Sequence, residues 1–301
     1  MPNFSISLDQ TVEFLVGLLN TPSPTGYHAE AIAYVRRAFE ALNLPGFTLS
    51  LTGKGALYGV WAGESNHLPR GVTAHVDTLG LMVKEIKHSG RLKTTQLGGF
   101  AWNAVENEGV TVRTFDDKRI RGTVVPVNPS THVNPNLRTM TRDADNMEIR
   151  LDVKVFNERD TRALGIEVGD FVFLDPRVEV TDTGFIRSRH LDDKISVACI
   201  YGAMLAMRDA GMRPAQETHL LIANYEEVGH GGAGGWRTTL DELLAIDMAA
   251  LGDGQNSTEY HCSVCVKDGG GPYHHDMNNK LIRLAREHEI VIKTDIYPFY
   301  S

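Results

Sequence analysis

The chain has 301 residues, of which 42% are hydrophobic and 23% charged. These values are ordinary for a soluble globular protein, and the length suits one large domain or a core domain with an insert. The net charge of −8 argues against a nucleic-acid-binding surface, because such surfaces are basic. No apolar run is long enough to span a bilayer, and the first residues lack the basic region and cleavage site of a signal peptide. We therefore expect a cytoplasmic protein that binds neither nucleic acid nor membrane.

The first part of the chain predicts two helices and several strands. Residues 9–20 carry helical apolar spacing up to Thr21-Pro22, and residues 25–43 carry a second helical face that ends at Pro45-Gly46. Short strand-like runs follow, and their sequences are FTLSLT, ALYGVWAG, GVTAHV and GLMVKEI. Residues 1–87 therefore predict two helices and the first strands of an α/β unit.

The pattern changes between about residue 90 and residue 185. Alternating β-branched runs dominate this part, and turn signals such as Asp116-Asp117 and Asn134-Pro135 separate them. No helical period stands out beyond a short turn. This part predicts an all-β, barrel-like module.

Helical and strand patterns return after the β-rich part. Residues 192–210 predict a helix with Gly211 and Pro214 just past its end. HLLIANY and LLAIDMA predict strands, and residues 277–289 predict a further helix. The simplest architecture is a discontinuous α/β domain, residues 1–88 and 186–301, interrupted by a β-rich insert domain, residues 89–185.

The three cysteines are Cys199, Cys262 and Cys265. An odd number predicts no disulfide framework. Cys262 and Cys265 have the spacing of half a zinc ribbon, but no second pair exists. We expect buried thiols on or near a strand.

Four residues that follow or interrupt strand-like runs are candidates for a metal site. His75 and Asp77 lie two apart in a strand and so face the same side, which lets His75 bind a metal while Asp77 orients its imidazole. An isolated His-x-Asp pair is weak evidence by itself. Asp192 opens the helix of residues 192–210, and it is either a helix N-cap worth about 1 kcal/mol or a carboxylate that bridges two metals. Asp247 interrupts the apolar run LLAIDMAAL, where a buried carboxylate needs a partner such as a metal ion.

The pair Glu226-Glu227 is the sharpest local signal. It ends the apolar strand LLIANY and precedes the glycine-rich GHGGAGG. Adjacent carboxylates repel each other unless they do different work, so one can bind metal while the other takes a proton from water. The alternatives are a solvated loop and a phosphate-binding loop, but the Lys-Ser/Thr ending of the latter is missing. The glycines let the backbone approach the site closely.

Together these segments resemble a known family. The motifs AHVDTLGLMV, LGIEVGDFVFLD, RHLDDKISV, NYEEVGHGGA and AIDMA are similar to the TET-type aminopeptidases, family forty-two of the metallopeptidases, which includes glutamyl and deblocking aminopeptidases. The resemblance runs from about residue 15 to the end. The insert lies between Asp77 and Asp192, as in that family, whereas in the related aminoacylase and carboxypeptidase family the second aspartate follows soon after His-x-Asp. The YPFY ending and the EEVGHGG loop look closest to a bacterial branch linked to osmoprotectant peptide gene clusters.

The resemblance implies a zinc-exopeptidase-like α/β/α sandwich with a barrel-like insert, and two divalent metal ions (zinc, cobalt or manganese). It implies that His75, Asp192 and Asp247 bind one ion, and that Asp192, Glu227 and a C-terminal histidine bind the other. Glu226 would be the general base for a metal-activated water. The resemblance also implies a cis peptide bond after Asp192.

The resemblance further implies short peptide substrates and a homo-oligomer, in which the insert builds dimers that assemble into a dodecamer. The family's last histidine ligand follows a segment like IYPFYS, whereas this chain ends at Ser301. We expect a C-terminally shortened chain, and the alternative is that His274 or His275 replaces the missing ligand.

Three functional hypotheses follow. The first is a metal-dependent aminopeptidase, the second a deacylase or amidohydrolase acting on a small blocked peptide, and the third a catalytically silent assembly or peptide-binding subunit. A glycosidase is disfavoured, because its carboxylate pair needs no His-x-Asp metal cluster.

Overall fold

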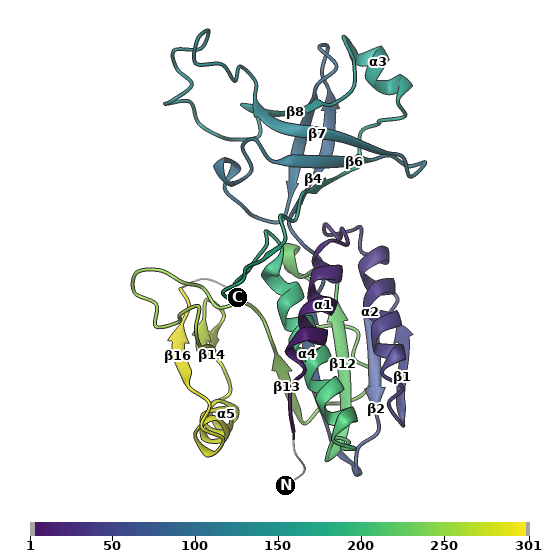
Figure 1. Ribbon diagram of the computed structural model, residues 1–301, viewed down its shortest axis with the longest axis vertical. Helices are drawn as coiled ribbons and strands as arrows, with labels where there is room; N and C mark the ends of the chain where they lie inside the picture. The colour runs from purple at the N-terminus through teal and green to yellow at the C-terminus, as the bar shows by residue number, and fades with distance from the viewer. Residues whose placement is uncertain (1–3, 299–301) are drawn as a thin grey trace. The chain divides into compact units, whose positions relative to one another are not determined.

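The structure, a computed structural model, describes residues 4–298. The chain forms two compact units that divide after Ala245. The first unit contains a mixed α/β core and a closed β-barrel (Figure 1), which confirms the predicted α/β fold class with a barrel. Of the YPFY ending, Phe299 and Tyr300 lie outside the described residues.

The α/β core is built on a five-stranded sheet with the order β1-β2-β12-β3-β13. Its strands are β1 (Phe47–Leu51), β2 (Leu57–Trp61), β3 (Ser65–His75), β12 (Gln216–Ala223) and β13 (Glu242–Ala245). β3 lies between β12 and β13 and runs parallel to both, with Ala223 opposite His75. The carboxyl ends of three parallel strands therefore meet at one edge of the sheet, which is where open α/β sheets bind ligands.

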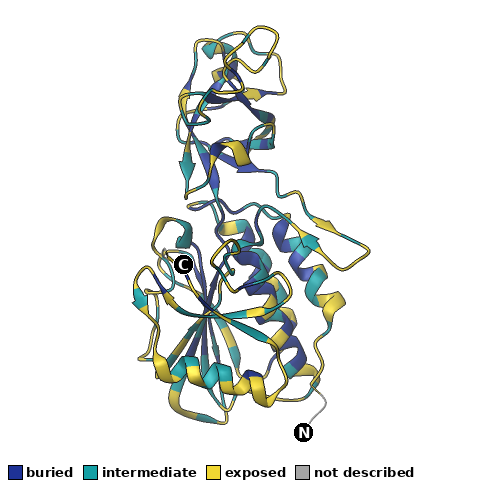
Figure 2. Ribbon diagram, turned by 90° about the vertical axis from the view of Figure 1, so that its left-hand side faces the viewer, coloured by how far each residue is buried: buried dark blue, intermediate teal, exposed yellow. Residues whose placement is uncertain are grey.

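Three helices cover one face of this sheet (Figure 1): α1 (Leu8–Leu19), α2 (Ala29–Ala41) and α4 (Leu191–Asp209). α1 buries its apolar side chains at helical spacing, Phe14 and Leu18 among them. The Phe14 ring stacks on Tyr201 of α4 with 4.3 Å between the ring centroids. Figure 2 shows these buried helix faces and the inner strands in dark blue. The packing of α1 and α4 fixes the start of α4, which carries Asp192.

The β-rich part closes into a barrel with the order β4-β5-β8-β7-β6-β9. Its strands are β4 (Gly80–Ile86), β5 (Leu92–Leu97), β6 (Gly109–Arg113), β7 (Arg119–Pro126), β8 (Met147–Leu151) and β9 (Phe171–Leu174). Alternate residues such as Val110 and Val112 point inward and are fully buried. The short helices η1 (Trp102–Ala104) and α3 (Glu158–Ala163) lie in its connections, and the hairpin of β10 (Glu179–Val180) and β11 (Ile186–Arg187) follows it.

The segment GLMVKEI differs from its expected place. We expected it to end the α/β part, but it forms β4, which pairs with β5 and β9 inside the barrel. Its alternating pattern identifies a strand and does not say which sheet that strand joins. The division into residues 1–88 with 186–301 and residues 89–185 stays a prediction.

The second unit contains a three-stranded sheet, β15-β14-β16, and one long helix. Its elements are β14 (Cys262–Asp268), β15 (Gly271–Pro272), α5 (His275–Glu287) and β16 (Ile292–Ile296). Our expectation of buried thiols was wrong, since Cys262 is exposed and Cys265 half-buried on a strand of this small sheet. Cys199 on α4 is exposed as well.

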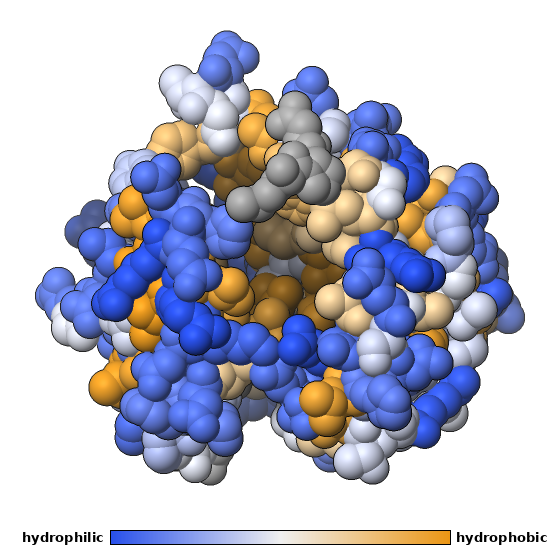
Figure 3. Space-filling view, turned by 90° about the horizontal axis from the view of Figure 1, so that it is seen from below, coloured by the Kyte–Doolittle hydropathy of each residue, from blue (hydrophilic) through white to orange (hydrophobic). Residues whose placement is uncertain are grey.

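Hydrophilic side chains dominate the outer surface seen in Figure 3. Among the helices of residues 4–298, none is both long and apolar enough to cross a membrane.

Candidate metal centre

His75 ends β3 at the carboxyl edge of the sheet, and its side chain is almost fully buried. The Nδ1 atom donates a hydrogen bond to the main-chain oxygen of Asp77 at 2.9 Å. The Nε2 atom lies 3.2 Å from Asp192 Oδ1 and 3.6 Å from Glu226 Oε2. A histidine whose Nδ1 is held as a donor presents Nε2 as the ligand atom. His75 therefore points its ligand nitrogen at two carboxylates from distant parts of the chain.

Asp77 is completely buried and connects three parts of the site. Its Oδ1 lies 3.4 Å from His75 Nδ1. Its carboxylate also accepts hydrogen bonds from the backbone N–H groups of Glu226 (3.1 Å) and Glu227 (3.3 Å). The predicted role of Asp77 is to orient His75, and the structure adds that Asp77 holds the backbone of both glutamates.

Asp192 and Asp193 lie at the start of α4. The peptide bond between them is cis, and both residues have non-helical backbone angles. The side chain of Asp192 faces His75, and in the described part of the chain it forms no hydrogen bond to a helix amide, so it does not cap the helix. Asp193 is fully buried, and its Oδ2 accepts a hydrogen bond from the backbone N–H of His75 at 3.2 Å.

Glu226 and Glu227 lie in the short helix η2 (Glu226–Val228), directly after the turn that follows β12. The barrel approaches them at Gly98, just past β5. Gly98 has a φ of 77°, and a Cβ there would lie 2.5 Å from Leu79 Cδ2 and 3.3 Å from the main-chain oxygen of Glu227. Only a glycine fits this approach without displacing its neighbours.

The charges of the site are unbalanced. Burial and the negative charge of Asp192 raise the pKa of Glu227 to about 8, and burial raises the pKa of Glu226 above its ordinary value. Burial opposes protonation of His75, but hydrogen bonds to Asp192 and Asp77 outweigh it and raise its pKa to about 12. Protons are thus held where carboxylates converge, which is the electrostatic signature of a cation site.

The segment of residues 21–25, between α1 and α2, supports the site from behind. Ser23 Oγ donates to the main-chain oxygen of Val76 at 2.6 Å, and Thr25 Oγ1 donates to Asp77 Oδ2 at 2.7 Å. Backbone hydrogen bonds join Ser23 and Thr25 to Thr78. These bonds keep residues 25–28 out of the helix, so α2 begins at Ala29, later than the sequence pattern predicts.

Lys194 holds the same segment from the other side. Its side chain is completely buried, and Nζ donates to the main-chain oxygens of Leu18 (3.0 Å) and Thr21 (2.7 Å). Burial lowers the pKa of Lys194 to about 7. The lysine satisfies carbonyl groups that the end of α1 leaves without helical partners. Sequence reasoning did not assign a role to Thr25 or Lys194, and the paired prolines Pro22 and Pro24 were the signal for a fixed loop.

The remaining predicted site residues lie in the second unit. Asp247 follows the end of β13 by two residues, and its Oδ1 accepts a hydrogen bond from the backbone N–H of Met248 at 2.6 Å. His274 caps α5 by accepting a hydrogen bond from the Met277 N–H, and His275 contacts Asn279 at 2.8 Å. The two histidines are thus engaged at the start of a helix.

The donor set of the first unit fits a divalent cation. One imidazole and several carboxylates converge, and His75 and Asp192 lie close enough to share one ion. Mixed histidine and carboxylate ligands suit zinc, cobalt and manganese. The buried bonds from Asp77 and Asp193 hold the ligands as an outer shell does in metal enzymes.

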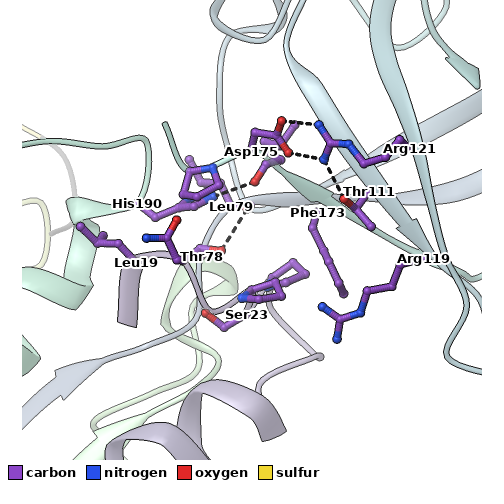
Figure 4. A pocket seen from close by; sticks show the side chains of 15 residues that line it. Leu19, Ser23, Thr78, Leu79, Thr111, Arg119, Arg121, Phe173, Asp175 and His190 are labelled. Atoms are coloured by element: carbon purple, nitrogen blue, oxygen red, sulfur yellow. Dashed lines mark hydrogen bonds and ion pairs between the residues drawn. The ribbon is translucent and has the colours of Figure 1, made fainter. Parts of the chain in front are cut away.

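A cavity of about 370 Å³ lies behind the centre, between the 21–25 segment and the barrel (Figure 4). Arg121 on its wall binds both carboxylate oxygens of Asp175, and Arg119 forms an ion pair with Glu30 of α2. Each arginine thus has a carboxylate partner; the Arg121–Asp175 pair lies within the barrel part, and the Arg119–Glu30 pair joins the barrel to the α/β core.

Comparison with known proteins identifies the family. Residues 55–301 match the family described as M42 glutamyl aminopeptidase. The chain belongs to the M42 family. A relative named "Putative aminopeptidase YhfE" from Bacillus subtilis (strain 168) is 44% identical over 295 residues, which cover 98% of this chain and 84% of that protein. M42 membership makes the chain a peptidase, and the predicted aminopeptidase activity is that of the family.

Solved structures share the M42 fold. A TET aminopeptidase from the marine sediment archaeon Thaumarchaeota archaeon SCGC AB-539-E09 superposes with a TM-score of 0.86 at 20% identity, covering 97% of this chain and 83% of that one. The TET1 peptidase of Pyrococcus horikoshii, described as able to assemble into a tetrahedron or a large octahedral shell, gives 0.79 at 18% identity, with coverages of 95% and 84%. These likenesses confirm the predicted fold and the resemblance to TET-type enzymes.

Proposed function

We propose that this M42 peptidase is a metal-dependent aminopeptidase that removes N-terminal residues from short peptides. The observation that carries the proposal is the convergence of two carboxylates on His75 Nε2 at the carboxyl edge of the sheet: Asp192 lies at 3.2 Å and Glu226 at 3.6 Å. Buried Asp77 supports His75 and Glu226. Divalent cations at such ligands would polarise the scissile carbonyl and acidify the attacking water.

In this proposal Glu226 is the general base. Its carboxylate lies 3.6 Å from the proposed ligand atom His75 Nε2, which places it beside a water held at the proposed metal centre, as a general base requires. Glu226 Oε2 would take the proton of the attacking water and deliver it to the leaving amine. Asp77 fixes the backbone of Glu226, so the position of the base depends on a residue that also orients His75.

The ligands are proposed as His75, Asp192 and Asp247 for one ion and Asp192 and Glu227 for the other. β13, which precedes Asp247 in the chain, runs parallel to β3 with Ala245 opposite Thr73. The ions are proposed to be zinc or cobalt, with manganese as a further candidate.

Assembly and location are proposed from the family. The solved TET1 relative is described as forming a tetrahedron or an octahedral shell, and we infer a homo-oligomer for this chain, with a dodecamer built from dimers as the specific form. A cytoplasmic location is part of the same proposal. Size-exclusion chromatography with light scattering distinguishes a dodecamer from a dimer.

The test of the metal centre is elemental analysis of the protein after dialysis against zinc or cobalt. We expect two ions per chain in the wild type and fewer than one in Asp192→Asn, because that carboxylate serves both ions. Full occupancy in Asp192→Asn would contradict the bridging role. Hydrolysis of a peptide with a free N-terminus, and of the same peptide acetylated, separates an aminopeptidase from a deacylase.

A further inference from the structure

A second cavity, of about 510 Å³, lies beside the metal centre and belongs to none of the roles above. Three parts of the first unit line it: residues 52–56 between β1 and β2, the end of β12, and the glycine-rich residues 229–235. Its volume falls in the range of small-molecule sites. Lys54 and His230 are among its lining residues, and the described lining includes no acidic side chain.

The floor of this cavity is continuous with the face of the sheet that carries His75. Leu221 and Ala223 of the floor pair with Thr73 and His75 across β12 and β3. Paired residues on neighbouring strands share a face and lie about 5 Å apart. The cavity therefore begins one strand away from the ligand histidine.

Tyr225, which directly precedes Glu226 in the chain, forms one wall of this cavity. Its ring is supported by His28 in an edge contact with 5.7 Å between centroids. Lys54 Nζ lies over this ring, 4.8 Å from its centroid. This cation–π contact holds a positive charge beside the wall without neutralising it.

The backbone around Lys54 is fixed. Its main-chain oxygen accepts a hydrogen bond from Asn224 Nδ2 at 2.7 Å, and Thr52 closes the turn by accepting hydrogen bonds from Gly55 and Ala56. Within the part of the chain that the structure describes, Lys54 forms no ion pair with a carboxylate. An exposed lysine that is held in place and lacks an acidic partner is available to an anion.

The two neighbouring regions carry opposite charge. The metal centre gathers carboxylates, which suit an amine and cations, whereas the cavity presents Lys54 and His230. A short peptide is a zwitterion that spans about 3.5 Å per residue. Its amino group can therefore lie at the carboxylates of the metal centre while a carboxylate one or two residues away lies in the cavity.

We propose that Lys54, held over Tyr225, binds a carboxylate of the peptide substrate in this cavity and so determines a preference for short peptides that present a carboxylate there. The inference rests on the proposed aminopeptidase function. The carboxylate comes either from the C-terminus of a dipeptide or from an acidic side chain, and the test below separates the two sources.

The experiment measures kcat/KM for the metal-loaded protein on Ala-Ala, Ala-Ala-amide, Glu-Ala-amide and Ala-Glu-amide. Lys54→Met keeps the aliphatic stem and removes the charge. On peptides whose carboxylate binds Lys54, the substitution should lower kcat/KM about 10- to 100-fold, mainly by raising KM. This is the effect expected from the loss of one charge-assisted hydrogen bond. Ala-Ala-amide, which has no carboxylate, should change less than about 2-fold.

Two further variants complete the design. Lys54→Arg should restore a large part of the loss, since it keeps the charge. Lys154→Met makes the same substitution at an exposed position of the barrel part and should behave as the wild type. A loss confined to Ala-Ala assigns the C-terminal carboxylate, and a loss confined to a glutamate-containing amide assigns the side chain.

Two results would overturn the inference: an equal loss on Ala-Ala and Ala-Ala-amide, or no loss on any peptide. Calorimetry measures the affinity of the same four peptides for the zinc-loaded Glu226→Gln variant, with and without Lys54→Met. This tests binding in the cavity independently of turnover. If the wild type hydrolyses none of the peptides while binding still depends on Lys54, the proposed function fails and the cavity assignment stands.

Discussion

The barrel and the edge of the five-stranded sheet both bury carboxylates, but they balance the charge differently. In the barrel, the buried Glu148 is held by Lys87 at 2.6 Å and by Arg91 at 2.5 Å. At the sheet edge, Asp77 and Asp193 are buried and Asp192, Glu226 and Glu227 lie close by. In the described part of the chain, His75 pairs with Asp77, Asp192 and Glu226.

The difference shows which region is complete on its own. The barrel supplies two cations for its buried carboxylate, so its charge is neutralised from within. The sheet edge gathers more negative charge than its residues neutralise, and buried charge without compensation is costly. A structural ion pair and a ligand set can thus be distinguished by whether the chain itself supplies the counter-charge.

The largest effect is expected for Glu226→Gln, which tests whether the carboxylates of the sheet edge serve catalysis. The substitution removes the base and leaves the other carboxylates, so turnover should fall about 10²- to 10⁴-fold while the metal content stays at the wild-type value. Steady-state kinetics together with elemental analysis checks both parts. Near-normal turnover would refute the assignment of the base.

Thr25→Val tests the support behind the site. It removes the hydrogen bond to Asp77 Oδ2 and nearly preserves side-chain volume, so metal affinity should fall about 10- to 100-fold, as for other outer-shell changes. Competition with a chelating dye measures this affinity. Thr21→Val is the matched control, because the Thr21 hydroxyl donates to the main-chain oxygen of Gly17 in α1, away from Asp77. Equal losses in both variants would contradict a specific role of Thr25.

A pair of amide substitutions should lower stability to different extents. Glu148→Gln leaves two cations without their carboxylate and should lower the free energy of unfolding by about 1–3 kcal/mol. Asp192→Asn weakens the interaction with His75 but also relieves repulsion with Glu227, so the metal-free protein should lose less stability than it does in Glu148→Gln. Urea denaturation in the presence of a chelator measures both, and a larger loss in Asp192→Asn than in Glu148→Gln would contradict the charge imbalance.

The pH dependence of the metal-free protein follows from the same imbalance. Glu227 keeps its proton up to a pKa of about 8 when folded, whereas the unfolded carboxyl loses it near pH 4.5, so stability falls as pH rises through this window. The raised pKa of His75 acts in the same direction above about pH 6.5. Denaturation between pH 5 and 8 should show this fall, a shallower one in Glu227→Gln, and a flatter profile with saturating zinc. If the stability of the metal-free protein rises over this pH range, the proposed excess of negative charge at the sheet edge is wrong.

Much of the fold follows from local patterns. Helices α1, α4 and α5 were predicted within a few residues, because their apolar spacing and ends are marked in the sequence. The start of α2 was missed because Thr25 and Ser23 bond to the β3–β4 connection, which lies about 50 residues further along the chain. β4 was placed with the wrong sheet, since alternation is the same in a barrel and in an open sheet.

The site was predictable in its chemistry and less so in its support. His75, Asp77, Asp192 and Glu226 converge as their residue types and strand-end positions predict. The hydrogen bonds that the Asp77 carboxylate accepts from the backbone N–H groups of Glu226 and Glu227 depend on the three-dimensional turn. No spacing in the sequence predicts them. Lys194 was equally hidden, because a lysine in a helix is ordinarily exposed and only the packing of α1 against α4 buries it.

Gly98 limits how freely the barrel can be exchanged. Gly98 lies against Leu79 and the backbone of Glu227. The barrel therefore contacts a proposed ligand residue directly. A chimera that carries the barrel of another relative would need a residue without a side chain at this point, or the glutamate turn would shift. Recombination between such enzymes is therefore constrained at this backbone contact as well as at the Arg119–Glu30 ion pair, whereas barrel residues away from the core are free to diverge.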